Sequence, residues 1–314
     1  MFNKLILTAY RLLGIIVLCL YLKPAVSQTI RHTIMVDGRE RNFLVYIPEQ
    51  YANAQNLKVI IALHGGGGTA ENTEQFYRLN PEADRFGYMV VYPNAINKAW
   101  NFPGTASRVK KLDTTVNDVH FMNALIDTLI ARYHINKAHV FFTGMSRGAM
   151  FSLYLAAALN HKIAGIAAVC GSISEENAAD YHFDRPIPAL IINGTADPLV
   201  PYNGGYGKWN RNNFSESANF IATPKLIQLL LQQNHCANES GVTVQIPNKD
   251  PLDGCTANET KYKCSSAPVE SITIQNGGHT WPGSSQYLPK IIVGRVCKDF
   301  SAAEKIVLFF NAVL

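Results

Sequence analysis

Two hydrophobic patterns alternate along most of the chain. Continuous apolar runs, such as LKVIIAL ending at Leu63, indicate strands that are buried on both faces of a sheet. Segments in which apolar residues recur every third or fourth position, such as 117–133, indicate helices with one buried face. The pattern predicts strands at 57–63, 88–92, 163–169, 189–193, 242–246 and 269–275, and helices at 69–86, 117–133, 224–234 and 302–312.

Strands that alternate with helices predict an α/β fold, in which a mostly parallel sheet is covered by helices on both faces. Residues 29–47 differ, because they alternate polar and apolar positions around Asp37-Gly38, a typical hairpin turn. We therefore expect an N-terminal antiparallel hairpin. No internal repeat or long linker interrupts the pattern, so residues 28–314 are expected to form a single catalytic domain.

The first 27 residues resemble a secretory signal peptide. Lys4 and Arg11 precede or begin an apolar run that ends near Leu22, and the small residues Ala25-Val26-Ser27 suit a cleavage site. An uncleaved membrane anchor is the alternative, but the run from residue 12 to residue 22 is short for a span. We expect a secreted or periplasmic protein with no stable membrane span after cleavage.

The basic charge of the chain comes largely from this segment. Removing Lys4, Arg11 and Lys23, with no acidic residue, lowers the formal net charge from +5 to +2. Such a balance gives no reason to expect a nucleic-acid partner.

Five cysteines follow residue 27, and in an exported protein they favour disulfides over metal binding. No Cys-x-x-Cys or His-x-x-x-His spacing suggests zinc, so we expect no metal and no cofactor. Cys170 lies in the apolar run GIAAVC and is expected to be a small buried residue. The pairing of the other four stays open on this reasoning: Cys236, Cys255, Cys264 and Cys297.

The clearest chemical signal lies between His139 and Ala158. An apolar run leads into Gly144-x-Ser146-x-Gly148 and then into a helix-forming segment. This order is that of a nucleophile elbow, a turn so sharp that the serine hydroxyl is exposed. The flanking positions are glycine because a Cβ atom there would collide with the neighbouring strand or helix. A bare Gly-x-Ser-x-Gly pattern also occurs by chance, so the assignment depends on a matching acid and histidine.

Asp197 and His279 supply that acid and that base. Asp197 follows the strand ALIIN, and His279 follows the last predicted strand within NGGHTWPG, which gives the chain order Ser, Asp, His of α/β-hydrolases. A histidine between the two would take the proton of Ser146, while the aspartate fixes its tautomer. The alternative for Asp197 is an ordinary turn residue. His64 is expected to brace the glycine loop after it.

The glycines after His64 suggest an oxyanion hole, because backbone N–H donors reach a negative oxygen only where no side chain intervenes. We expect one donor from Arg147, the residue after the nucleophile, and another from Gly66 or Gly67. The alternative is a flexible turn.

These motifs together carry a resemblance. LHGGGG, Trp100-Asn101, GMSRGAM, NGTADPLVPY and GGHTWPG resemble the secreted polyhydroxybutyrate depolymerase and feruloyl esterase family of α/β-hydrolases, which is placed with carbohydrate esterase family 1 and LpqC-like esterases. The resemblance implies the triad Ser146, Asp197 and His279. It also implies a disulfide between Cys236 and Cys264, suggests a second one between the remaining late cysteines, Cys255 and Cys297, and leaves Cys170 free.

The resemblance implies an ester substrate: a feruloyl or acetyl ester of plant polysaccharide, or a short hydroxyalkanoate ester. Trp100 and Trp281 are candidates for an acyl pocket, with a place in the core as the alternative. Two other functions share the fold. A serine peptidase would need a propeller or an acidic amine-binding site, which the sequence does not show, and a non-catalytic binding protein would usually lack a triad residue. The oligomeric state stays open.

Overall fold

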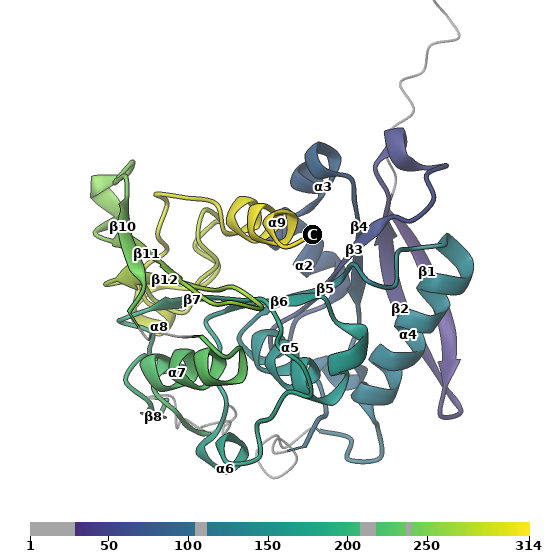
Figure 1. Cartoon of the computed structure of the whole chain (residues 1–314), viewed down its shortest axis with the longest axis horizontal. Coiled ribbons are helices and arrows are strands. Elements are labelled where there is room, and N and C mark those ends of the chain that lie inside the picture. The colour runs from purple at the N-terminus through teal and green to yellow at the C-terminus, as the bar shows by residue number, and fades with distance from the viewer. Residues whose placement is uncertain (1–28, 104–111, 208–217, 237–239) are drawn as a thin grey trace, which may run out of the picture.

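The computed structural model contains a ten-stranded sheet in the order β1-β2-β4-β3-β5-β6-β7-β12-β11-β10 (Figure 1). It describes residues 29–103, 112–207, 218–236 and 240–314, so the predicted signal peptide lies outside it. The strands of this sheet are β1 (Ile30–Val36), β2 (Arg39–Tyr46), β3 (Lys58–Leu63), β4 (Tyr88–Pro93), β5 (Val140–Met145), β6 (Gly165–Val169), β7 (Ala189–Gly194), β10 (Val242–Ile246), β11 (Thr256–Tyr262) and β12 (Val269–Gln275). β8 (Gly205–Tyr206) and β9 (Asn219–Phe220) form a separate pair.

The middle of the sheet is parallel, as the apolar runs predict. β4, β3, β5, β6, β7 and β12 pair in parallel with one another in that order. The predicted hairpin is also present, because β1 and β2 pair antiparallel and β2 pairs antiparallel with β4. Asp37 and Gly38 both have positive φ, 51° and 73°, as a two-residue hairpin turn requires. All six parallel strands end at one edge of the sheet.

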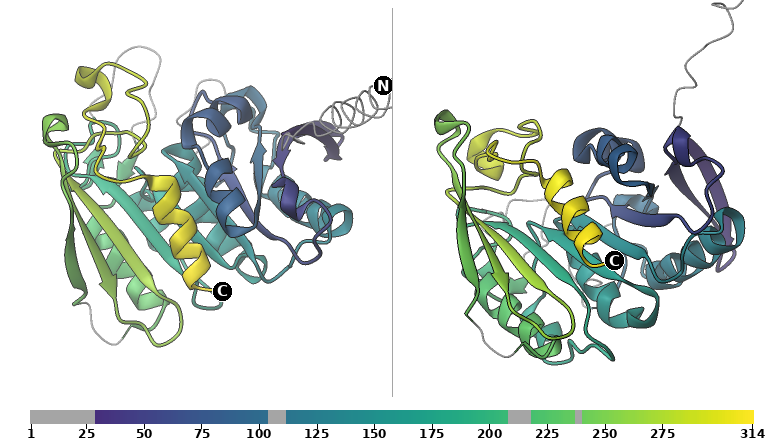
Figure 2. Two further views of the ribbon diagram at one scale, coloured as in Figure 1. Left: turned by 90° about the horizontal axis from the view of Figure 1, so that it is seen from above. Right: turned by 45° about the horizontal axis from the view of Figure 1, so that its top comes forward.

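Helices cover both faces of the sheet (Figures 1 and 2). On one face α2, α3 and α9 bury a core with one set of alternating strand residues, and on the other face α4, α5 and α7 bury the opposite set. None of the helices within the described ranges has the length and apolar character that crossing a membrane requires. The helices are α2 (Ala70–Tyr77), α3 (Asn80–Phe86), α4 (Asp118–Tyr133), α5 (Arg147–Ala158), α6 (Glu175–Ala178), α7 (Thr223–Gln233), α8 (Lys290–Val293) and α9 (Ala302–Ala312).

The structure differs from the prediction at two main points: one predicted helix is divided, and one strand was not predicted. The single helix expected at 69–86 is two helices, because Arg78 adopts the left-handed conformation with φ 56° and ends α2. The polar segment between the last two predicted strands contains β11, which the hydrophobic pattern does not reveal. β11 has one fully buried side chain, Ala257, and pairs antiparallel with β10 and β12 on its two sides. Pairing between strands, rather than burial of its own side chains, therefore places it.

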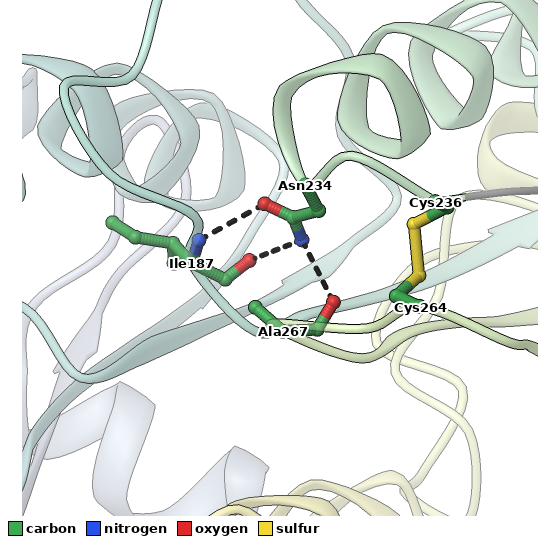
Figure 3. The surroundings of a disulfide bond; sticks show 5 residues. All are labelled: Ile187, Asn234, Cys236, Cys264 and Ala267. Atoms are coloured by element: carbon green, nitrogen blue, oxygen red, sulfur yellow. Dashed lines mark hydrogen bonds between the residues drawn. A yellow bond between two sulfur atoms is a disulfide. The ribbon is translucent and has the colours of Figure 1, made fainter.

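A disulfide joins the segment after α7 to the segment between β11 and β12. Cys236 and Cys264 are joined, as the resemblance implies. Beside them the buried side chain of Asn234 accepts a hydrogen bond from the N–H of Ile187 at 2.9 Å and donates to the carbonyls of Ile187 and Ala267 (Figure 3). The suggested second bridge is wrong in this structure, because Cys255 and Cys297 are both free and buried. Cys170 is also free and buried, as predicted.

The disulfide should contribute measurably to stability. The two cysteines are 28 residues apart in the sequence, so removing the bond restores chain entropy to the unfolded state, worth about 3.5 kcal/mol. We expect the double variant Cys236→Ala/Cys264→Ala to lose about that much free energy of unfolding in urea titrations. A matched control is Cys170→Ala, which removes a buried thiol but no cross-link. An equal loss in the control and the double variant would contradict a contribution from the cross-link.

Candidate active site

Ser146 sits at the turn between β5 and α5. Its backbone has φ 58° and ψ −123°, a conformation that residues with a side chain rarely adopt, and its side chain does not cap the helix. Ser146 as a whole is half-buried at the sheet edge. A Cβ atom at Gly148 would lie 2.2 Å from the carbonyl oxygen of Leu63, so only glycine lets the first turn of α5 pack against the end of β3. These features are those of a nucleophile elbow.

Asp197 and His279 meet at the same edge of the sheet. They follow β7 and β12, which are neighbouring parallel strands, and the Nδ1 of His279 lies 2.7 Å from Oδ2 of Asp197. Both side chains are only 2% exposed. Oδ1 of Asp197 accepts hydrogen bonds from the N–H groups of Leu199 and Val200, at 2.8 and 2.9 Å. Because the carboxylate accepts the proton at Nδ1, the other ring nitrogen of His279 is left as a base.

The backbone around His279 is held at two points. Its N–H donates to the carbonyl of Val293 at 2.5 Å, and its own carbonyl accepts from the hydroxyl of Tyr287 at 3.0 Å. The glycines before the histidine allow this close packing, because a Cβ atom at Gly278 would lie 2.1 Å from the carbonyl oxygen of Val293. The imidazole therefore keeps its place opposite Asp197 through its backbone as well as its ring.

His64 braces the glycine loop, as the sequence predicts. Its Nδ1 lies 2.7 Å from the carbonyl oxygen of Gly65, and its Nε2 accepts from the N–H of Ala95 at 3.1 Å. Burial lowers the pKa of His64 to about 4, since the charged imidazolium loses its hydration there. His64 is thus a neutral structural residue over the working range of a histidine base.

The glycine loop lies beside the serine, but only one of the two predicted glycine donors is available. A Cβ atom at Gly65 would lie 3.6 Å from Cβ of Ser146, which places the loop against the nucleophile. The N–H of Gly67 already donates to the carbonyl of Lys98 at 2.9 Å, so Gly67 is not an oxyanion donor here. Gly66 is exposed, and its N–H has no hydrogen-bond partner among the described residues. Arg147 is the first residue of α5, a position whose N–H lies outside the intrahelical ladder.

Trp100 and Trp281 do not line an open pocket. Trp100 is 0% exposed, and its Nε1 donates to the carbonyl of His64 at 2.8 Å. Trp281 is 1% exposed and stacks on Tyr77, with ring centroids 3.8 Å apart. Both indoles are therefore core residues that support the site, and the prediction that they bind substrate is wrong for this structure. A tryptophan within a sequence motif does not by itself tell these two roles apart.

The side chain of Arg147 is turned into the core rather than toward a ligand. Its Nε and Nη2 donate to the carbonyl oxygen of Trp100 at 2.9 and 2.7 Å. Tyr77 makes a similar link on the other face of the sheet: its hydroxyl donates to the carbonyl of Leu63 and accepts from the N–H of Met145, both at 2.9 Å. The ends of β3 and β5 are thus tied together next to the serine.

Cys170 is a neighbour of the site that sequence reasoning did not assign to it. It follows β6 with φ 50°, and its thiol donates to the carbonyl of Thr280 at 3.2 Å. Its sulfur, a carboxylate oxygen of Asp197 and a ring nitrogen of His279 all lie within 4.8 Å of one another. Burial raises the pKa of Cys170 well above its usual value, so the thiol stays neutral beside Asp197 and His279. Its position directly after a strand of the parallel sheet is the signal that could have revealed it.

A cavity of about 330 Å³ opens beside α5. Met150, one turn after Ser146, contributes to its wall together with Tyr154 of the same helix. The rest of the wall comes from the end of α5, from the loop between β4 and α4 at Phe102, from the segment after β6 and from β9. Its other aromatic residues are Tyr181 and Phe220. Apart from Met150, which ends the GMSRGAM motif, no sequence motif marks these residues, because they come from segments far apart in the chain.

The order of the strands, the elbow and the placing of acid and base define a protein of the α/β-hydrolase fold. The chain belongs to the phospholipase/carboxylesterase family, whose pattern matches residues 49–211. It is therefore a carboxylic-ester hydrolase by family, as the sequence motifs predict.

Individual relatives agree with this placement. "Putative esterase NocK" of Nocardia uniformis subsp. tsuyamanensis is 29% identical over 90% of this chain and 83% of its own. Feruloyl esterase C of Emericella nidulans is 27% identical over 54% of this chain and 59% of its own. Among solved structures, an acetyl xylan esterase from Aspergillus awamori has a TM-score of 0.56 at 14% identity, covering 90% of this chain and 99% of its own, which shows a shared fold.

Burial of His64 should make stability depend on pH. Its folded pKa of about 4 lies below the ordinary value of 6.5, so the unfolded chain binds the proton more readily. The free energy of unfolding that depends on neutral His64 is fully present above about pH 6.5. On the order of 3 kcal/mol of it is lost as the pH falls toward 4. His64→Gln keeps a donor and an acceptor but does not titrate. We expect wild type to lose more free energy of unfolding than this variant between pH 7 and pH 4; parallel curves would contradict the assignment.

Proposed function

We propose that the protein is an exported serine esterase that works through an acyl-enzyme, with Ser146 as nucleophile, His279 as general base and Asp197 as the orienting acid. The observation that carries the proposal is the buried bond of 2.7 Å between His279 and Asp197, at the sheet edge on which the strained serine turn also lies. A serine hydroxyl becomes a useful nucleophile only when a positioned base removes its proton.

The proposed reaction has two steps. The Oγ of Ser146 attacks the ester carbonyl carbon, its proton passes to His279, and the leaving alcohol then takes that proton as the C–O bond breaks. Water attacks the acyl-enzyme in the second step and gives a proton to His279. His279 passes this proton to Oγ of Ser146 as the acyl–oxygen bond breaks, which releases the carboxylic acid and restores the serine hydroxyl. N–H groups of Gly66 and Arg147 are the proposed donors to the negative oxygen that forms in each step.

The substrates that we propose are esters of plant polysaccharide with feruloyl or acetyl groups, with short hydroxyalkanoate esters as the third class. Relatives named feruloyl esterase and acetyl xylan esterase support the first two. The cavity beside α5 favours the feruloyl group among them, because its aromatic wall residues suit the flat face of a phenolic acid. Met150 lies close enough to Ser146 along α5 for a bound acid to reach both.

Export is part of the proposal. The N-terminal pattern of residues 1–27 supports it, and so does the Cys236–Cys264 disulfide, since such bonds persist in oxidising compartments. A secreted or periplasmic location would bring the enzyme to substrates that are too large to enter a cell.

Replacement of the nucleophile tests the mechanism. Ser146→Ala should fold like wild type and lose about 10⁶-fold in kcat, and Asp197→Asn should lose about 10⁴-fold. Initial rates on methyl ferulate, an acetylated xylo-oligosaccharide and a 3-hydroxybutyrate oligomer measure both the loss and the substrate class. Ser152→Ala, which removes another hydroxyl from α5, is the control and should keep its activity. Full turnover in Ser146→Ala would refute the nucleophile.

Filling the cavity tests the preferred acid. Met150→Trp should narrow the space beside Tyr154 and lower kcat/KM for methyl ferulate by about tenfold or more, while the rate on a small acetyl ester changes little. Met35→Trp makes the same change on exposed β1 and serves as the control. Equal losses on the feruloyl and the acetyl ester would show that the cavity does not hold the acid.

A further inference from the structure

A second group of reactive side chains lies outside the proposed active site. It forms where the loop before β11 meets the loop before α9. Asp253 belongs to the short 3-10 helix η4 (Pro251–Asp253), and Cys297 and Asp299 belong to the second loop. One ligand atom of each lies within 4.8 Å of the other two, and the three residues are 7%, 0% and 0% exposed.

The two carboxylates hold the loops together through backbone N–H groups. Asp253 accepts from Cys255 at 2.6 Å with one oxygen and from Lys298 at 2.7 Å with the other. Oδ1 of Asp299 accepts from Lys249 at 2.9 Å and from the next residue at 3.2 Å. The remaining oxygen, Oδ2 of Asp299, is buried and has no hydrogen-bond partner among the described residues. Such an oxygen in a completely buried side chain calls for a ligand.

The charge of the group is also uncompensated. No ion pair joins Asp253 or Asp299 to a basic side chain within the described parts of the chain, and the nearby Lys298 pairs instead with Asp250 at 3.5 Å. Buried carboxylates are normally paired with a cation or bound to a metal ion, because an isolated buried charge is costly. Two such groups side by side therefore indicate a place for a cation.

The thiols narrow the choice of cation. Cys297 contacts the thiol of Cys255, so two sulfur atoms lie beside the two carboxylates. Zn²⁺ accepts both thiolate and carboxylate ligands in a tetrahedral site. Ca²⁺ takes six to eight oxygen ligands and Mg²⁺ keeps an octahedral oxygen shell, so neither suits a small site that contains sulfur.

We propose that Asp253, Cys297 and Asp299 bind a structural Zn²⁺ ion, with Cys255 beside them as the fourth ligand. Each thiol loses its proton to solvent when its sulfur binds the metal, so binding releases up to two protons and leaves an overall charge of −2 on the group. The ion binds the free oxygen of Asp299, compensates the carboxylates and fastens the loop 249–255 to the loop 297–299. The site takes no part in ester hydrolysis, so it stands or falls independently of the proposed function.

Metal analysis of the purified chain tests the site. After dialysis against Zn²⁺ and gel filtration, wild type should retain about one zinc per chain. Asp299→Asn and Cys297→Ser should lower the affinity by more than the 10- to 100-fold that is typical when a metal ligand merely loses its supporting partner. Asp250→Asn is the matched control, because Asp250 lies in the same loop and takes no part in the group of three. It should retain zinc like wild type.

Cobalt gives a second reading, which tests whether sulfur binds the metal. Co²⁺ bound to wild type should show a thiolate-to-metal absorption band, and Cys297→Ser, which keeps only Cys255 as a sulfur ligand, should show a weaker band. Failure of wild type to retain zinc or to show the band overturns the proposal. So does equal retention of zinc by Asp299→Asn and Asp250→Asn, and so does a Cys255–Cys297 disulfide found by peptide mapping in protein purified without reductant.

Discussion

The close approach of α5 to the end of β3 is the constraint on which the proposed active site depends. The carbonyl oxygen of Leu63 occupies the space that a side chain at residue 148 would need. Because the helix can lie this close, the chain must turn within one residue, and Ser146 takes up the strained conformation of that turn. The strain is stable only because the strands and helix on either side fix the turn.

Hydrogen bonds from buried polar side chains hold the loops around this turn in place. His64, Tyr77 and Trp100 each satisfy a backbone group at the edge of the sheet, and none of them is open to solvent. Trp100 and Trp281, the two aromatic motif residues that look suited to ligand contact, are likewise buried and support the site instead. The proposed acyl site lies against residues of α5 and β9, of which only Met150 belongs to a recognisable motif.

The sequence was informative where one local rule decides the structure. Apolar runs mark β3, β4, β6 and β7, and a two-residue turn marks the hairpin, because burial and turn geometry are written in neighbouring residues. It was uninformative where contacts come from distant segments. The hydrogen bond of Gly67 to Lys98, the polar strand β11 and the meeting of Asp253 with Asp299 all depend on packing that no local pattern records. The Cys236–Cys264 bond came from a family resemblance, since counting cysteines left several pairings open.

The acid and the base are held by adjacent strands, while the serine stands on a strand farther along the sheet. β7 and β12 are hydrogen-bonded to each other up to Gly194 and Ile274, but β6 and β7 lie between β5 and β12. A change in the twist of the sheet therefore changes the distance between Ser146 and His279 more than the distance between Asp197 and His279. The proposed catalytic group is in this sense made of two parts, and the twist of the sheet sets the distance between them.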